Sequence, residues 1–433
     1  MGEGHKKLNF SDCMGLAIGQ IIGSGIMVLT GIVIGLTGHG IAAAFILGAV
    51  LAIITCVPFI ILTSAIPSSG AGFTYIRRLM GEKAGFMYIA MFVLSQVLIA
   101  TYAKGFASYF CSIFPLFGES AVAMAALVIC TAINLIGLKS SALVQKGMVV
   151  LLLLSLFLFI VFGLPKVSWD ALTPTVSNLM PNGPKNFFTG VALLSFACGG
   201  AKFVAENGDD IVEPSRTIPK VIVLSTSIVA VFYVLIGIVA GGVLPVETVA
   251  FQNLTLVAQE IFPTWLYLFF VFGGAVFALL TTVTRGLQAA AKQGWLPEKT
   301  AEENKNGVPV ILLMVFFLMG AIPILTGMDL TLISNMGVGT DMVTEFMVLL
   351  ACWRLPDIFP EEYQKSAFCM KKRTLHILLF FIGILMIGTS YVNLSDLTVP
   401  AAIACGIYIL VMFVYTQVRY PYVKAKQEKK ENK

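Results

Sequence analysis

The chain alternates between long apolar stretches and short polar segments along almost its whole length. A hydrocarbon core about 30 Å thick is crossed by roughly 20 apolar residues in an α-helix. The pattern therefore predicts an all-α integral membrane protein, in which residues 1–433 form a single membrane domain. Twelve stretches meet the length requirement, and we expect a spanning helix over each of 11–36, 39–66, 84–113, 119–138, 143–164, 186–212, 218–243, 264–292, 308–326, 329–352, 374–393 and 397–418.

Composition and charge support this class and add an orientation. Hydrophobic residues make up 58% of the chain and charged residues only 12%, which is too little charge for the surface of a soluble domain. Lysine and arginine gather in alternate connecting segments, and only Lys166 and Lys185 fall on the opposite side. The positive-inside rule then places both termini in the cytoplasm, and we expect the cell (plasma) membrane as the location. The net charge of +5 reflects this rule, so no nucleic-acid partner is expected. The basic tail, 419–433, is expected either to lie near anionic lipid headgroups or to be solvated.

Two glycine clusters interrupt the first and sixth predicted spans at their middles. Gly23-Ser24-Gly25 lies within IIGSGI, and Gly199-Gly200 lies within SFACGGAK. The sixth span comes five spans after the first, so the two helices cross in opposite directions. Unwound segments at corresponding positions of two inverted halves indicate a transporter binding site. The repeats would be about 11–164 and 186–352, with 374–418 as an addition. The competing interpretation is close helix packing through small residues.

An interrupted membrane helix offers chemistry that suits an amino acid. The break exposes N–H groups at the start of one half-helix and carbonyls at the end of the other. The N–H groups suit a carboxylate and the carbonyls suit an ammonium group, so we expect an α-amino acid substrate. The candidate substrate-binding residues are Ile21, Gly23, Ser24, Gly25, Ile26, Phe196, Ala197, Cys198, Gly199 and Gly200.

Charged residues inside the spans are further candidates, because their burial in a membrane is costly. Asp341 and Glu345 are four residues apart, hence on one face of the tenth predicted span. They would line the permeation path or carry a proton. Alternatively, they would pair with Lys202, Lys104 or a cytoplasmic arginine and only fix the packing. Lys104 itself is expected to extend toward the outer surface.

Other motifs narrow the function classes. The chain contains no GxxxxGK[ST], HExxH or GxSxG pattern, so we expect neither an ATP-driven pump nor an enzyme. The eight cysteines and three histidines are scattered, which predicts no cofactor, no metal site and no disulfide. An amino acid sensor that binds without transporting remains the alternative to a transporter. A long cytoplasmic tail would favour that alternative, and the predicted tail is short.

Four ordered blocks of the sequence resemble the amino acid–polyamine–organocation permeases, and within them the L-type amino acid transporters and prokaryotic relatives. This resemblance implies a LeuT-like fold of 5+5 inverted repeats with discontinuous helices 1 and 6, plus helices 11 and 12. It also implies an amino acid held between helices 1, 3, 6 and 8, and alternating access. We expect a secondary amino acid transporter that works as a uniporter, as an exchanger (antiporter) or with proton coupling as a symporter. No obligate protein partner is expected, and the oligomeric state stays open. The blocks are IGQIIGSGIMVLTG (18–31), PSSGAGFTYIRRLMGEKAGF (67–86), FACGGAKFVAENGDDIVEPSRTIPK (196–220) and TRGLQAAAKQGWLPE (284–298).

The sequence departs from this family at two places. The position of the lysine that many relatives carry in helix 5 is Leu152 here, and the nearby helix 8 serine position falls near Ala278 or Leu279. These two missing polar groups are the first departure, and they weaken the case for sodium coupling or lysine-mediated proton coupling. The second departure is Lys202, which stands where relatives carry an acid or an amide. It would replace the missing charge, face the substrate side chain, or pair with Glu206 four residues on.

Overall fold

The structure, a computed structural model, describes residues 8–431 of the chain apart from 23, 69, 137, 173–174 and 275–283. In this part of the chain every regular element is helical, and two isolated backbone bridges join Leu8 to Ile211 and Glu303 to Pro309. The predicted all-helical fold class is therefore confirmed for the residues that are described.

Twenty α-helices and six 3-10 helices follow one another among the described residues. Those before residue 180 are α1 (Phe10–Ile21), α2 (Ser24–Thr37), η1 (Gly38–Gly40), α3 (Ile41–Ala65), α4 (Ala71–Met80), α5 (Glu82–Ser95), α6 (Leu98–Ile113), α7 (Glu119–Ile136), α8 (Leu138–Gly163), η2 (Leu164–Lys166), η3 (Trp169–Leu172) and α9 (Val176–Leu179). Those after it are α10 (Gly183–Cys198), η4 (Gly199–Glu206), η5 (Gly208–Asp210), α11 (Pro214–Gly242), α12 (Val246–Val249), α13 (Thr255–Ile261), α14 (Thr264–Gly274), α15 (Thr284–Lys292), η6 (Glu298–Ala301), α16 (Val310–Leu325), α17 (Leu330–Ile358), α18 (Pro360–Lys365), α19 (Lys372–Leu394) and α20 (Val399–Glu431).

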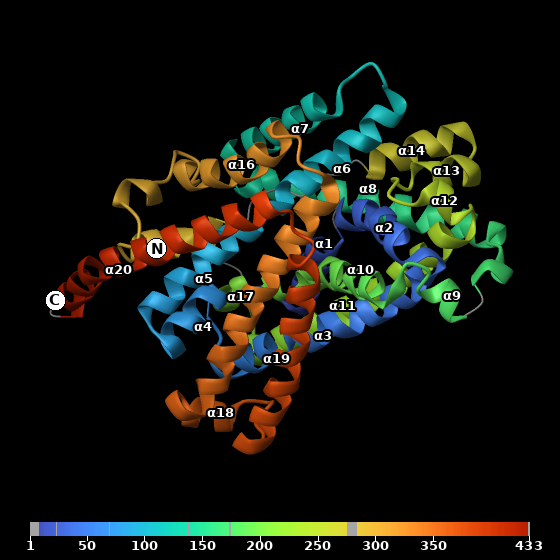
Figure 1. Cartoon of the computed structure of the whole chain (residues 1–433). Helices are drawn as coiled ribbons and strands as arrows, with labels where there is room; N and C mark the ends of the chain where they lie inside the picture. Colours follow the sequence, from blue (N-terminus) through green and yellow to red (C-terminus); the bar gives the residue numbers. More distant parts are fainter. Residues whose placement is uncertain are drawn as a thin grey trace.

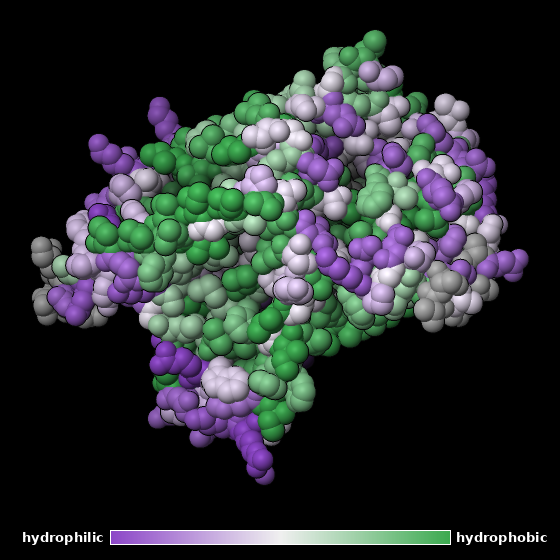
Figure 2. Space-filling model, viewed as in Figure 1, coloured by the Kyte–Doolittle hydropathy of each residue, from purple (hydrophilic) through white to green (hydrophobic). Residues whose placement is uncertain are grey.

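Nine stretches of the described helices are long and apolar enough to cross a membrane, and α16 is a shorter apolar helix. The predicted count of twelve spans stays a prediction, since the stretch from α14 to α15 contains the undescribed residues 275–283. Figure 2 shows hydrophobic side chains over the middle of one face, and hydrophilic ones near the C-terminal end of α20 and around α18. Exposed apolar side chains such as Phe381 (60%) and Leu410 (62%) therefore suit contact with lipid.

Helix α17 lies in the middle of the bundle and packs against α3, α4, α5, α6 and α19 (Figure 1). Helix α3 in turn packs along α10 and α11. The halves of the first and sixth predicted spans meet in reverse order, because α1 contacts η4 and α2 contacts α10. The two helices thus run side by side in opposite directions, as the glycine clusters predict.

Two predicted spans differ in detail from the observed helices. The third predicted span, 84–113, matches the apolar stretch Glu82–Ile113, which consists of α5 and α6 with Gln96 and Val97 between them. There the N–H groups of both residues bond the carbonyls three positions earlier, at 3.1 and 3.3 Å, which tightens the backbone locally. The last helix continues beyond the predicted end at 418 to Glu431. Along this extension Arg419 and Lys426 bond the carbonyl of Gly294 and the carboxylate of Glu298.

Candidate functional site

The first helix is interrupted where its glycine cluster predicts. Asn9 and Asp12 form a reciprocal cap that starts α1, with N···O distances of 2.9 and 3.0 Å. The helix ends at Ile21, and Ile22 has extended backbone angles of φ −84° and ψ 91°. Gly23 lies outside the described residues, and Ser24 and Gly25 are described only as the first two residues of α2.

The sixth helix changes type at its glycine cluster instead of unwinding. Helix α10 ends at Cys198, and the chain continues directly as the 3-10 helix η4. The Gly199 N–H donates to the carbonyl of Phe196. That carbonyl, expected to be free for a ligand, already accepts one hydrogen bond within the chain. Here the sequence pattern located the irregularity but did not reveal its geometry.

The two interruptions touch each other through Gly200. A Cβ atom at this position would lie 2.4 Å from the carbonyl oxygen of Gln20 and 2.8 Å from the nitrogen of Ile21. A glycine is needed for this approach of the two backbones. Gly200 therefore serves the close packing that was the competing interpretation of the glycine cluster.

Gly199, unlike Gly200, has open space beside its Cα atom. It is buried, yet a Cβ atom built on it would have no atom outside its own segment within 4 Å. Ala197 and Cys198 are also buried, and Phe196 is half-buried beside them. The structure thus places open space beside Gly199, immediately next to the contact between η4 and α1. Ile21 and Ile26 lie on the two sides of the helix 1 break and are buried too.

Two buried tyrosines bond the backbone of the first helix, and the sequence analysis missed both. The Tyr233 hydroxyl donates to the carbonyl of Ile21, at 3.0 Å. The Tyr109 hydroxyl donates to the carbonyl of Met27, at 3.1 Å, and accepts from the N–H of Leu254, at 3.0 Å. A tyrosine in an apolar span needs a partner for its hydroxyl, and this requirement could have singled them out.

A cluster of three charged side chains lies just beyond the glycines of η4. The Lys202 ammonium group is 2.9 Å from the Asp341 carboxylate and also bonds one oxygen of Glu345. All three are buried, with exposed fractions of 7%, 3% and 3%. The predicted common face of Asp341 and Glu345 on one helix is observed in α17. One of the predicted pairings, to Lys202, is also observed.

The 3-10 conformation changes the predicted relation between Lys202 and Glu206. In an α-helix residues four apart share a face, but with three residues per turn they are separated by about a third of a turn. Glu206 nevertheless lines the same small cavity as Lys202, Asp341 and Glu345. The cavity measures about 10 Å³ and is further lined by Phe59, Tyr88, Phe92, Phe203 and Thr344. This volume is close to what one water molecule needs.

Backbone hydrogen bonds join three chain segments near the N-terminal end of α1. The Leu8 N–H donates to the carbonyl of Asp210, at 2.8 Å, and the Val212 N–H donates to the carbonyl of Leu8, at 3.0 Å. The Gly70 N–H donates to the carbonyl of Glu206, at 3.2 Å. The entry to α1, the turn before α4 and the exit from η4 are thereby tied to one another.

The remaining candidates lie elsewhere. Lys104 donates to the carbonyl of Met328, in the turn before α17, which is compatible with the predicted outward extension. Leu152, at the position of the relatives' helix 5 lysine, is fully buried, whereas Ala278 and Leu279 lie outside the described residues. All eight cysteines are free thiols. In the part of the chain that is described, no group of three or more metal-ligating side chains could hold a metal ion.

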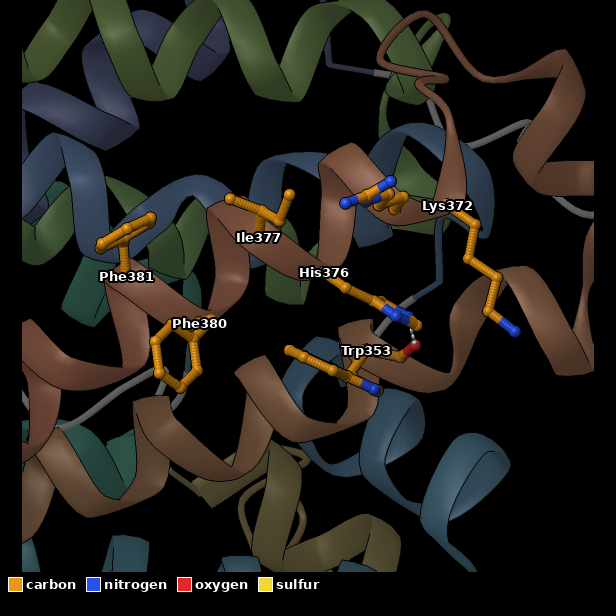
Figure 3. A pocket seen from close by; sticks show the side chains of 7 residues that line it. Trp353, Lys372, His376, Ile377, Phe380 and Phe381 are labelled. Carbon is orange, nitrogen blue, oxygen red and sulfur yellow. Dashed lines mark hydrogen bonds between the residues drawn. The ribbon is translucent and has the colours of Figure 1, made fainter.

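A larger cavity of about 810 Å³ lies near the start of α19, away from these candidates (Figure 3). The rings of Trp353 and His376 stack there with centroids 4.1 Å apart, and His376 Nε2 lies 3.1 Å from the carbonyl oxygen of Trp353. Lys372 is ion-paired with Asp357 and points away from the stacked rings. No candidate substrate residue lines this cavity, so its lining does not match an amino acid site formed by broken helices.

Comparison with known proteins identifies one matching family and several similar proteins. The family model described as amino acid permease matches residues 8–418. A branched-chain amino acid permease of Bacillus subtilis is 26% identical over 73% of this chain and 74% of its own length. The large neutral amino acids transporter small subunit 2 of Mus musculus is 28% identical over 82% of this chain and 71% of its own. A methylthioribose transporter of Bacillus subtilis is 29% identical over 55% of this chain and 56% of its own length.

Proposed function

This chain belongs to the amino acid permease family, and from that premise we propose that it is a secondary active amino acid transporter that works by alternating access. It is a multi-pass membrane protein, and its substrate is a small molecule. The proposal includes twelve spans, a LeuT-like 5+5 repeat, a cell-membrane location with cytoplasmic termini, and activity without an obligate protein partner. The observation that carries it is the meeting of the two interrupted helices at Gly200, with open space beside Gly199.

We place the substrate between the interrupted segments of helices 1 and 6. The end of α1 and the start of α2 provide backbone groups of opposite polarity, which suit the ammonium and carboxylate groups of an amino acid. The open space beside Gly199 provides room close to both. The proposed substrate-binding residues are those predicted from the sequence, Ile21, Gly23, Ser24, Gly25, Ile26, Phe196, Ala197, Cys198, Gly199 and Gly200.

We further propose that the substrate side chain is neutral and apolar, as in branched-chain amino acids. Among the proposed binding residues none carries a charged side chain. Lys202 is already paired with Asp341 and Glu345, so it is compensated without a substrate. This pairing disfavours the interpretation in which Lys202 faces an acidic substrate. The names of the branched-chain permease and the large neutral amino acids transporter point to the same class.

The test is uptake into proteoliposomes. Labelled leucine, lysine and glutamate are supplied outside in turn, to vesicles that are either empty or loaded with unlabelled leucine. We expect leucine to enter, with lysine and glutamate at background. Entry only into loaded vesicles indicates an exchanger, and entry into empty vesicles indicates a uniporter or symporter. The absence of leucine uptake in both conditions, with none for the other amino acids, contradicts the proposal.

The second candidate is an amino acid sensor that binds without transporting. It predicts that leucine raises the unfolding temperature of the purified protein while no label enters vesicles. Methylthioribose, named by one relative, is included as a competitor. If methylthioribose but not leucine blocks the site, the assignment to amino acids is wrong.

A further inference from the structure

The buried cluster beyond the helix 6 glycines has an unbalanced charge. Lys202 contributes one positive charge, whereas Asp341 and Glu345 contribute two negative charges when ionised. The net charge is then −1 at a site where each residue is at most 7% exposed. A buried uncompensated charge is strongly unfavourable, and such groups usually neutralise themselves. One additional positive charge would therefore make the cluster neutral.

One carboxylate oxygen of this cluster is a suitable site for the additional charge. Glu345 bonds Lys202 through Oε1, and its other oxygen, Oε2, is buried without a hydrogen-bond partner. A proton on Oε2 would make the cluster neutral, and Oε1 would still accept the hydrogen bond from Lys202. The adjoining cavity of about 10 Å³ is close to the size of one water molecule, which could exchange that proton.

Among the described residues that line the cavity beside Glu345, Lys202 is the only one with a positively charged side chain. Glu206 of η4 and Tyr88 of α5 line the same cavity. Cys56 on α3 and Tyr102 on α6 are the titratable groups that interact with the cluster from those helices. None of these four side chains can carry a positive charge, so they do not balance the excess negative charge of the cluster.

We infer that Glu345 binds one proton while the cluster is buried, and that Lys202 stays charged and bonded to Asp341 and Glu345 in that state. The inference rests on the proposed transport function. Lys202 belongs to η4, the element whose Gly200 packs against α1 at the proposed substrate site. A movement of η4 relative to α17 that opens the substrate site would separate Lys202 from Asp341 and Glu345. The freed and hydrated carboxylate would then release its proton to water.

This assignment makes the transporter a proton symporter. One proton from the solution on one side would travel on Glu345 for each neutral amino acid, and would leave to the solution on the other side. The transport cycle then carries one net positive charge. The carboxylate takes up and releases the proton without any other reactant. Lys202 does not have to lose a proton at any stage.

The test measures proton movement and amino acid movement separately. Proteoliposomes contain a pH-sensitive dye, and unlabelled leucine is added outside. Counterflow of labelled leucine is followed in vesicles preloaded with leucine. We expect internal acidification with the wild type and with Glu247→Gln, which removes an exposed carboxylate on α12. Glu345→Gln should reduce acidification to background and retain counterflow, since glutamine keeps the cluster neutral without a proton.

Each other outcome has a defined meaning. Acidification by Glu345→Gln at the wild-type rate overturns the inference. Wild-type counterflow without acidification also overturns it, although the proposed transport function then stands. If the wild type moves neither leucine nor protons, the proposed function fails together with the inference.

A second variant covers the case in which Glu345→Gln is inactive. Asp341→Asn leaves Lys202 and Glu345 as a neutral pair, so it should retain counterflow and lose proton movement. If Asp341→Asn still acidifies the vesicles, or if both variants lose counterflow while folded, the charge balance is not the basis of coupling.

Discussion

The contact of Gly200 with the first helix gives the sharpest prediction about the proposed site. In Gly200→Ala the new methyl group would lie 2.4 Å from the carbonyl oxygen of Gln20, whereas non-bonded atoms prefer about 3.5 Å. One of the two backbones must therefore move by about 1 Å. Gly199→Ala is the matched control, because it adds the same methyl group one residue earlier, where nothing lies within 4 Å.

The size of the effect follows from this overlap. Forcing an extra methyl group into a packed site costs about 1–3 kcal/mol. For a chain of 433 residues, an unfolding entropy of about 2.1 cal/mol/K per residue gives about 0.9 kcal/mol per kelvin. Gly200→Ala should thus lower the unfolding temperature by about 1–3 °C. Gly199→Ala should leave it unchanged or raise it slightly, because alanine restricts the unfolded chain.

The assay is thermal unfolding of both purified variants, followed by leucine binding. Equal unfolding temperatures for the two variants would refute the backbone contact between η4 and α1. The methyl group of Gly199→Ala enters the open space where we place the substrate, so leucine should bind more weakly although stability is kept. Wild-type affinity in this variant would show that the substrate does not use that space.

Three further predictions concern buried polar groups. Lys202→Met removes the shared partner of two buried acids and should cost about 3–5 kcal/mol of stability, most of which returns when both acids are also made amides; an unchanged melting curve would contradict the ion pairing. Tyr109→Phe removes two hydrogen bonds and should cost about 1–3 kcal/mol, whereas Tyr391→Phe, at a residue 71% exposed, should stay within about 0.5 kcal/mol in the same melting assay. Tyr233→Phe frees the carbonyl of Ile21 and should change leucine affinity more than stability, as binding titrations on the purified protein would show; an unchanged affinity would place that carbonyl outside the site.

The partners of the charged residues were not predictable from the sequence. The spacing of Asp341 and Glu345 placed them on one face, because that relation is local to a helix. Their pairing with Lys202 joins residues more than 130 positions apart and depends on how η4 packs against α17. The sequence analysis named this pairing as one of several, and local periodicity gave no means to choose among them.

Of three backbone irregularities, the sequence predicted one and missed two. The break of helix 1 was predicted from Gly23-Ser24-Gly25. Glycines permit irregular backbone, and irregular backbone inside a membrane is tolerated only where it is buried or lines a cavity. The split at Gln96 and Val97 was missed, because neither residue resembles a helix breaker. The 3-10 form of η4 was missed as well, because glycines permit several backbone forms and the packing of Gly200 on Gln20 selects among them.

The sequence by itself determined the helical membrane class, the position of the helix 1 break and the shared face of the two acids. Each of these depends on interactions within one segment, namely the length of an apolar run, the flexibility of glycine and the helical repeat. Only the tertiary structure decided which segments meet, that Gly200 closes the contact between helices 1 and 6, and that Glu345 keeps an unpaired oxygen. These features depend on distances between remote segments, which the local pattern of residues does not contain.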